Sequence, residues 1–590
     1  MKKIKATCIT LIKGLKYLWS EHHFIVPLTM WKDYYKKFKR RVIHRSGILY
    51  YNPADTKDYN WWLEKHISTN SKIQVLTTNV KFLIFVDAIN FNQVKLDMTL
   101  SSISMQTYKN YKVFVFYNNT LEINKNYSKF LVYGMEDMLE IINKVSYENK
   151  NNYISILTAG DLYEQYTLNL VVRTVNKNSD IALIYGDEDD ICGEYKINPL
   201  FKPDYSPDTL LSYNYIGDAV FYKSNLISEL GGLDKNLGKS ALYDMGLKIF
   251  SQNYIVEHIP SIIFHKGDYS KRVKSEIKLV NRFFKTNNID ADASTNGSKE
   301  YMLIHYKLKE TPLVSIIIPT RDYSEITRNC ITSLYEKTQY HNYEIIIVDN
   351  GSVEEKTIKL FEEFKQKYNN FRIIRDDGDF NFSRLNNLAV KISKGSVLVL
   401  LNNDTEIISG NWLNILVGYA LQPHIGAVGP KLLYKDNTVQ HGGIILGLGD
   451  VAAHAYLNAS DDENGYMYQL KSSHDCAAVT AACLVIEKKK YLECGMLNEK
   501  LKVAYNDVEL NIKLLKLGYY NVLVPEIKIY HLESKSRGLD TTTEKYKLLQ
   551  RERDYMYSNY TEFIKRDPYY NDNFTKLEFD SNFLLKEIEE

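Results

Sequence analysis

The sequence contains no run of eighteen consecutive apolar residues, although 45% of its 590 residues are hydrophobic. We therefore expect no transmembrane helix. The apolar stretch near the N-terminus is interrupted by Lys13 and Lys16 and lacks a clear cleavage site, so we do not interpret it as a signal peptide. We expect a cytoplasmic protein.

Cysteine is also scarce. The six cysteines form no Cys-x-x-Cys pair and no regular framework, and several of them fall in apolar stretches. This pattern is typical of reduced, buried thiols in a reducing compartment.

The chain has little net charge, only +2, so the whole molecule is not a binder of polyanions and we expect no nucleic-acid partner. The charge is uneven, however: residues 1–45 carry twelve Lys and Arg against Glu21 and Asp33. Mixed with apolar residues, this composition predicts a basic, amphipathic N-terminal arm over residues 1–75 that contacts an anionic membrane peripherally, on its inner face. The alternative is a basic helix packed on the protein body.

The length predicts two to four domains. From about residue 78, apolar runs alternate with helix-like segments, which is typical of an α/β sheet. The clearest unit begins with an apolar strand at residues 314–318, stopped by Pro319, followed by a helix from Ser324 and a second strand at residues 344–348. This arrangement indicates a nucleotide-binding half-sheet.

An internal repeat divides the chain. SISMQTYKNYKVFVFYNNT (102–120) parallels SLYEKTQYHNYEIIIVDNGS (333–352), and TAGD (158–161) falls where LNNDTE falls. We therefore predict two tandem domains of one architecture, at residues 76–296 and 312–540, with a helical C-terminal extension at residues 541–590.

Acidic residues follow the apolar strands of the second domain. Asp349 and Asp404 each come at the end of a strand, where open α/β sheets bind ligands. Transfer from a nucleoside diphosphate needs a hard cation on oxygen ligands, and Asp404 is the best candidate ligand. Asn403 could contribute an oxygen or bind the ribose. The alternative for Asp404 is a polar turn after a buried strand.

Asp507 stands at the start of an amphipathic helix and suits the carboxylate that removes a proton from an acceptor hydroxyl. An Asn-Asp pair at a helix start also serves as a cap. His531 follows a strand-like run and could complete a metal site, although a lone histidine is more often structural. Arg537, in the loop that follows, could neutralise a diphosphate.

Ten motifs, in order and spacing, resemble the bacterial family-2 glycosyltransferases of O-antigen and capsule synthesis. They are VSIIIPTRD, YEIIIVDNGS, NFSRLNNLAV, GSVLVLLNNDTEI, NWL, VGPKLLY, QHGGIILG, AVTAACLV, NDVEL and YHLESKSRG, and they cover residues 312–540. The resemblance implies a GT-A fold (Rossmann-like), a Mg2+ or Mn2+ ion, a nucleotide-sugar donor and inversion at the anomeric carbon.

The resemblance also assigns roles to residues. It places Thr320, Asp322, Asp349, Asn386, Asn403 and Arg537 at the nucleotide and its diphosphate, Asp404 and His531 at the metal, and Asp507 at the acceptor hydroxyl. The acceptor would be a growing, lipid-linked surface glycan.

The first domain resembles a tandem copy found in some of these proteins, through YGDEDD, LFKPDYSPDTLLSYNYIG and GGLD. Its catalytic positions differ, because Tyr117 corresponds to Asp349 and Leu242 to Asp507. An isobutyl group cannot accept a proton. We therefore expect one active and one degenerate domain, although Asp161, Asp187 and Asp189 remain.

Three alternatives stay open at this point. Both domains could add sugars, or the chain could be a scaffold that only holds glycan. Nucleotidyltransferases also use acids at strand ends, but they usually carry a Gly-rich phosphate loop where this chain has Pro319, Thr320, Arg321 and Asp322.

Overall fold

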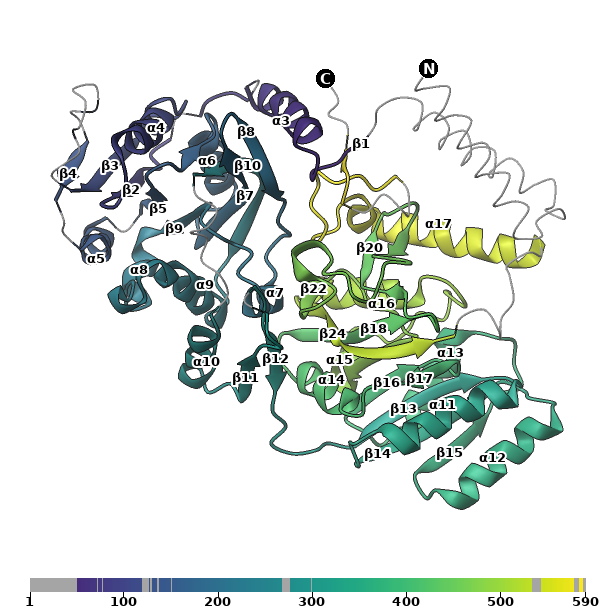
Figure 1. Cartoon of the computed structure of the whole chain (residues 1–590). Coiled ribbons are helices and arrows are strands. Elements are labelled where there is room, and N and C mark those ends of the chain that lie inside the picture. Colours follow the sequence, from purple (N-terminus) through teal and green to yellow (C-terminus); the bar gives the residue numbers. More distant parts are fainter. Residues whose placement is uncertain are drawn as a thin grey trace.

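The computed structural model describes residues 50–586 except 72, 77, 119–121, 123–126, 128–129, 135–136, 150, 268–275, 299, 533–542 and 578–582. Two α/β halves lie side by side, the first drawn in purple to teal and the second in green (Figure 1). The predicted α/β class is confirmed. Most of the predicted basic arm, residues 1–49, lies outside the described residues, whereas β1 (Tyr50–Tyr51) and α3 (Thr56–Ser71) belong to the packed structure.

The first half is built on one sheet with the strand order β4-β3-β2-β5-β9-β7-β10-β6, and β8 pairs with β7. Its strands are β2 (Phe82–Ala88), β3 (Tyr111–Tyr117), β4 (Leu131–Tyr133), β5 (Tyr153–Thr158), β6 (Leu162–Tyr163), β7 (Leu183–Cys192), β8 (Tyr195–Leu200), β9 (Val220–Lys223) and β10 (Val256–Lys266). Its helices are α4 (Gln93–Ser104), α5 (Met138–Glu148), α6 (Thr167–Lys177), α7 (Pro207–Ser212), α8 (Ser224–Glu229), α9 (Ala241–Ser251) and α10 (Ile277–Thr286).

The second half has a sheet in the order β15-β14-β13-β16-β23-β18-β24-β17, with β19 on β18 and β22 on β24. Its strands are β13 (Val314–Thr320), β14 (Tyr343–Asp349), β15 (Phe371–Arg375), β16 (Val397–Leu401), β17 (Thr405–Ile407), β18 (Ile425–Leu433), β19 (Val439–His441), β20 (Ile444–Leu446), β21 (Ala452–His454), β22 (His474–Cys476), β23 (Cys483–Glu487) and β24 (Tyr520–His531). Its helices are α11 (Ser324–Lys337), α12 (Glu355–Lys367), α13 (Phe382–Ile392), α14 (Trp412–Ala420), α15 (Lys488–Glu493) and α16 (Asn506–Lys516).

The two sheets share one strand order. Position by position, β2, β3, β5, β9, β7 and β10 correspond to β13, β14, β16, β23, β18 and β24, with the same parallel or antiparallel pairing at each step. The register agrees as well: Tyr117 pairs with Ala88 at the end of β3, as Asp349 pairs with Thr320 at the end of β14. Leu242 and Asp507 are each the second residue of their helices, α9 and α16.

The central strands β13, β14 and β16 are buried along their whole length, because both faces of the sheet are covered by helices. The prediction that Pro319 stops the first of them is wrong. Strand β13 continues to Thr320, and its pairing with β16 already ends at Ile317, so the missing N–H of Pro319 falls where the strand has a neighbour on one side only.

The halves are joined through β11 (Ala291–Ser294) and β12 (Leu303–Tyr306), and they share a hydrophobic core cluster. Between them, the Asp475 carboxylate accepts hydrogen bonds from the backbone N–H of Thr209 at 2.9 Å and from its hydroxyl at 3.1 Å. The Ser212 hydroxyl donates to the Ser473 carbonyl at 2.6 Å. The two sheets are thus fixed to one another by buried contacts.

The C-terminal segment combines α17 (Thr543–Lys565), drawn in yellow, with an irregular stretch that passes between the halves (Figure 1). The Asn571 amide donates to both oxygens of Asp187 in the first half, at 3.1 and 3.0 Å. The Asp567 carboxylate accepts from the Leu446 N–H in the second half at 2.7 Å. Strand β25 (Leu585–Lys586) then pairs with β1. Among the described residues, no helix is both long and apolar enough to cross a bilayer.

Candidate active site

The candidate site lies at the edge of the second sheet where β13, β14 and β16 end. These strands are parallel, so Thr320, Asp349 and the loop after Leu401 lie along the same edge. Strand β23 is antiparallel to β16 and begins at this edge, which brings the residues before Cys483 to it as well. The sequence prediction that these segments meet is consistent with this topology.

Asp349 and Asp322 shape the loop that follows β14. The Asp349 carboxylate accepts the Ser352 N–H at 2.9 Å and a hydrogen bond from Arg375 Nη1 at 2.9 Å. Asp322 Oδ1 accepts the N–H groups of Val353 and Glu354, at 2.8 and 2.9 Å. Asp322 therefore folds the loop with one oxygen, a role that the sequence did not indicate.

Buried amides line the inner part of this edge. Asn403 donates from Nδ2 to the Thr320 hydroxyl at 2.8 Å. Asn386, on α13, is fully buried and donates to the Phe382 carbonyl at 2.8 Å, but its Oδ1 accepts no hydrogen bond. Asn350 Oδ1 and Asp376 Oδ2 are likewise buried oxygen atoms that accept no hydrogen bond. These three buried acceptors have no protein donor, so a ligand or ordered water would have to supply one.

His531 and Asp404 face each other across the β17–β24 pair, where Thr405 pairs with His531. His531 Nδ1 lies 3.0 Å from Gln440 Oε1, an atom that can only accept, so Nδ1 carries the proton. His531 Nε2 then accepts a hydrogen bond from the Asn402 side-chain amide at 3.2 Å and lies 3.2 Å from Asp404 Oδ1. Asp404 Oδ1 is buried and accepts no hydrogen bond.

This donor set fits a divalent cation. A carboxylate oxygen and an imidazole nitrogen are both ligands that divalent cations accept, and Gln440 supplies the outer hydrogen bond that metal-binding histidines usually have. Within the described residues, no three His, Cys, Asp or Glu side chains are grouped closely enough to hold a metal ion. Asp404 and His531 could therefore hold a cation only together with ligand oxygens or water.

Asp507 lies in the first turn of α16, half-buried, with its carboxylate directed to β23. Its Oδ2 accepts the Ala481 N–H at 3.0 Å and its Oδ1 the Val508 N–H at 2.8 Å. Two backbone N–H groups thus fix the position of this carboxylate at the start of α16. The neighbouring residue Ala482 accepts the Asn402 N–H at 3.0 Å, which links the Asp507 region to the loop that carries Asp404.

The loop before α16 is held from outside the sheet. Glu552, on α17, is 2% exposed and accepts the N–H groups of Lys502, Val503 and Ala504 at 2.6, 3.2 and 2.7 Å. Tyr505 follows in a left-handed conformation with φ of 59°. Sequence reasoning missed Glu552, which carries no motif and acts on residues about fifty positions earlier.

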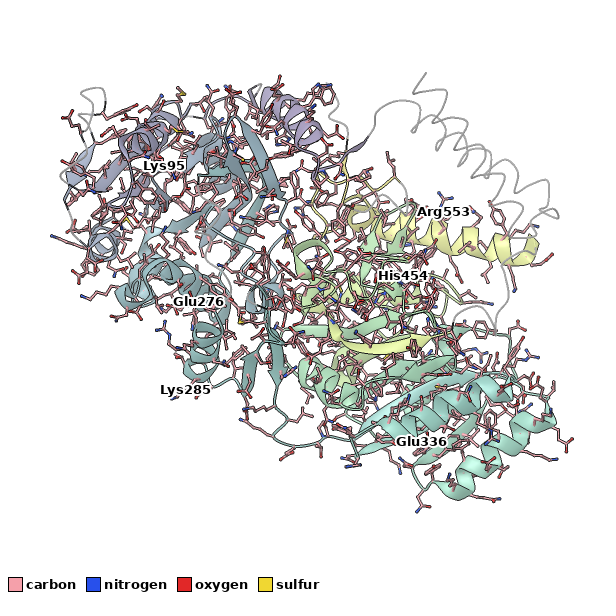
Figure 2. The ribbon with its side chains drawn as sticks, in the orientation of Figure 1. Lys95, Glu276, Lys285, Glu336, His454 and Arg553 are labelled. Atoms are coloured by element: carbon pink, nitrogen blue, oxygen red, sulfur yellow. The ribbon has the colours of Figure 1, made fainter. Side chains whose placement is uncertain are left out.

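Sequence reasoning also missed a pair of histidines beside Gln440. His441 is fully buried, and its Nδ1 lies 2.8 Å from Nδ1 of His454. Burial first, and then the neighbouring histidines, hold the pKa of His441 well below its usual range. Figure 2 shows His454 in the second half, on the side where α17 carries Arg553. The QHGG motif was the available signal. Arg537 lies outside the described residues.

The first half differs at the corresponding places. Tyr117 stands where Asp349 stands, and Leu242 where Asp507 stands. Two of the remaining acids are engaged in structural contacts: Asp187 with His258 Nε2 at 2.9 Å and with Asn571, and Asp189 with the Tyr59 hydroxyl at 2.6 Å.

Comparison with known proteins finds that the family model Glycosyl transferase family 2 matches residues 315–470. A protein described as uncharacterized protein y4gI, from Sinorhizobium fredii, is 36% identical over 440 residues, which are 71% of this chain and 48% of that protein. The O-antigen biosynthesis protein RfbC of Myxococcus xanthus is 28% identical over 443 residues, 72% of this chain and 34% of that protein. The chain thus spans about half and a third of the length of these relatives.

Among solved structures, GalNAc-T7 with UDP, GalNAc and Mn2+ has a TM-score of 0.37 and 16% identity, over 46% of this chain and 53% of that one. The matched family region, residues 315–470, contains Thr320, Asp349, Asn386 and Asp404, and it begins in β13 of the mixed sheet described above. The resemblance noted in the sequence motifs therefore has support over residues 315–470, which match the Glycosyl transferase family 2 model and lie in an α/β half of the chain.

Proposed function

We propose that this protein is an inverting glycosyltransferase whose second half moves a sugar from a nucleotide-sugar donor to a hydroxyl of a growing surface glycan. The observation that carries the proposal is the Asp404–His531 pair, in which a buried carboxylate oxygen without a hydrogen bond lies 3.2 Å from an imidazole nitrogen. Both atoms are ligands of a kind that divalent cations accept.

The nucleoside would lie over the ends of β13 and β14. Asn350 Oδ1, Asp376 Oδ2 and Asn386 Oδ1 are buried acceptors without donors, and the N–H and O–H groups of a base and ribose would satisfy them. The surrounding hydrogen-bond network is formed by Thr320, Asp322, Asp349 and Asn403. These residues would both shape the nucleoside site and contact the nucleoside.

Asp404 and His531 would hold a Mg2+ or Mn2+ ion. When bound, the ion would neutralise the negative charge that develops on the leaving diphosphate. The protein supplies only these two ligands. Mg2+ in proteins is commonly held by one or two protein ligands, and substrate phosphates and waters complete its coordination. Arg537, in the following loop, would add a second positive charge near the diphosphate.

Asp507 would act as the base. Its carboxylate accepts the proton of the acceptor hydroxyl while that oxygen forms a bond to the anomeric carbon, and the bond from the anomeric carbon to the diphosphate breaks on the opposite face. The configuration at that carbon is therefore inverted. The Ala481 N–H holds this carboxylate in place at the start of α16.

The acceptor would be a lipid-linked glycan at the inner face of the cell membrane. Support comes from the similarity to an O-antigen biosynthesis protein and from the basic composition of residues 1–45. The first half would be a tandem copy without transfer activity, since Tyr117 and Leu242 replace the acids at the two key places. A chain active in both halves does not explain why Tyr117 and Leu242 replace the acids of the first half. A scaffold that only holds glycan does not explain the Asp404–His531 pair of the second half.

The test is a panel of nucleotide sugars incubated with the full-length protein and Mn2+, with hydrolysis and thermal stabilisation measured for each. We expect one donor to be hydrolysed slowly, and EDTA to stop the reaction reversibly. The Asp404→Asn variant should retain its thermal unfolding temperature and lose hydrolysis. Undiminished hydrolysis in EDTA would remove the cation from the proposed mechanism, and the absence of any response to any donor would contradict transferase function.

A further inference from the structure

Asp161 of the first half occupies the place that Asp404 occupies in the second. Each acid directly precedes a short strand, β6 or β17, and the first residue of that strand pairs antiparallel with a histidine near the end of the long strand β10 or β24. Leu162 pairs with His265, and Thr405 pairs with His531. The register alone therefore aligns the two acids and the two histidines.

The surroundings of the two acids differ in one respect that matters for a cation. Next to His265 in the chain stands Lys266, whose Nζ lies 3.4 Å from Asp161 Oδ2 and 2.5 Å from Asp218 Oδ2. The Lys266 and Asp161 side chains are each 3% exposed. At the corresponding place after His531 stands Leu532, an apolar residue.

The histidine of the first half is also used differently. His265 Nδ1 lies 2.6 Å from Asp189 Oδ1, and its Nε2 lies 3.2 Å from Glu164 Oε2. Both ring nitrogens thus face carboxylates other than Asp161. Neither ring nitrogen of His265 therefore has Asp161 as its partner, whereas His531 Nε2 lies 3.2 Å from Asp404 Oδ1.

The remaining oxygens around Asp161 are satisfied as well. Its carboxylate accepts the Thr158 N–H at 2.8 Å and the Gly267 N–H at 3.0 Å. Burial alone would lower the pKa of Lys266, but the carboxylates of Asp218 and Asp161 outweigh burial and raise it, so this amine stays charged. A buried ammonium between two carboxylates offsets part of their negative charge, as a bound cation would.

We propose that Lys266 is the built-in cation of the first half and takes the place of a metal ion there, so that the protein binds divalent metal in its second half alone. The donor set of the first half does not fit a metal. The part of this inference that concerns metal binding by the second half rests on the proposed function. In the first half, the ion pair of Lys266 with Asp161 and Asp218 occupies the place that corresponds to the metal site.

The experiment counts Mn2+ ions bound to full-length protein by electron paramagnetic resonance, with Mn2+ alone as the probe. We expect one ion for the wild type, one for Asp161→Asn and none for Asp404→Asn. An ion that persists in Asp404→Asn and disappears in the Asp161→Asn/Asp404→Asn double variant would overturn the proposal. A wild type that binds no ion would overturn the claim that the second half alone binds metal, and with it the proposed metal-dependent function.

A second variant tests the replacement directly. In the Asp404→Asn background, Lys266→Met removes the ammonium that contacts Asp161 and Asp218 directly. This variant should unfold at a lower temperature, and Mn2+ should raise that temperature, whereas Asp404→Asn alone should show no response. Lys239→Met, at the exposed lysine that donates to Thr158 Oγ1 at 3.3 Å, is the matched control and should not gain a response to Mn2+. If the Lys266→Met protein folds and Mn2+ does not raise its unfolding temperature, the proposal that the Lys266 ammonium takes the place of a metal ion is contradicted.

Discussion

Gln440 Oε1 lies 3.0 Å from His531 Nδ1, and this one contact determines which nitrogen of the imidazole faces Asp404. Gln440→Leu removes the acceptor and allows the ring to turn or change tautomer. Outer hydrogen bonds of this kind are worth roughly 10–100-fold in metal affinity, so we expect a loss of that size in Mn2+ binding by titration calorimetry. Gln440→Glu keeps an acceptor at the same place and should bind Mn2+ at least as well as the wild type. An equal loss in both variants would show that the contact does not act through the histidine.

Asp507→Asn separates chemistry from binding. The amide keeps the size of the carboxylate and can still accept the Ala481 N–H, but it cannot take up a proton. We expect kcat to fall by about two to four orders of magnitude, with the donor KM little changed. Steady-state kinetics with a saturating acceptor measures both. A variant that loses donor affinity and keeps its rate at saturation would rule out Asp507 as the base.

Glu552→Gln tests whether α17 positions Asp507. The carboxylate accepts three consecutive N–H groups of the loop before α16, and an amide cannot bind them as strongly. Small displacements of a catalytic group cost up to about 100-fold, so kcat should fall by roughly tenfold to 100-fold while the donor KM stays the same. Glu544→Gln, at an exposed residue of the same helix, is the control.

The double variant Asp507→Asn/Glu552→Gln tests whether Glu552 affects kcat through Asp507. If Glu552 acts through Asp507, the second substitution should add little once the base is gone. Effects on kcat that simply multiply would assign Glu552 to general stability instead.

His258 should make the stability of the protein depend on pH. Burial lowers the pKa of this histidine, but the carboxylates of Asp187 and Asp204 outweigh burial and raise it above the ordinary value of 6.5. A raised pKa in the folded state means that the stabilisation is complete below about 6.5 and is lost as the pH rises through the folded value. The unfolding temperature of the wild type should therefore fall more between about pH 6 and pH 9 than that of His258→Gln, measured by calorimetry. A steeper fall in the variant would contradict the charged pair.

The basic composition of residues 1–45 predicts binding to anionic membranes. Each Lys or Arg near such a surface contributes about 1 kcal/mol, and salt screens the attraction. Full-length protein should sediment with anionic vesicles at low salt and dissociate as salt rises, and a chain that starts at residue 50 should stay in the supernatant. This truncation leaves the β1–β25 pair intact. Equal sedimentation of both proteins would assign the arm to packing.

The sequence was sufficient for the α/β class, because this class depends on local signals: apolar runs, and acids at the ends of strands. The correspondences of Tyr117 with Asp349 and of Leu242 with Asp507 also agree with the register of the two sheets. Pro319 misled the strand prediction, because whether a missing N–H matters depends on the neighbouring strand and not on the residue itself.

The supporting contacts could not be predicted in this way. Gln440 and His531 are 91 residues apart, and Lys266 and Asp161 are 105 apart, so only the folded sheet brings each pair together. Side-chain direction at such places is set by packing in three dimensions. A motif identifies the acid at a strand end, but it does not tell whether a histidine or a lysine will face it.

The contact between Asn571 and Asp187 has a consequence for biosynthesis. Asn571 is added to the growing polypeptide 384 residues after Asp187, so the ribosome releases a first half whose buried carboxylate still lacks one of its amide partners. Chains that terminate before residue 571 would keep the contacts of Asp187 with His258 and with the Lys202 N–H but lack the amide of Asn571. The first half therefore gains this contact only after the second half has been synthesised.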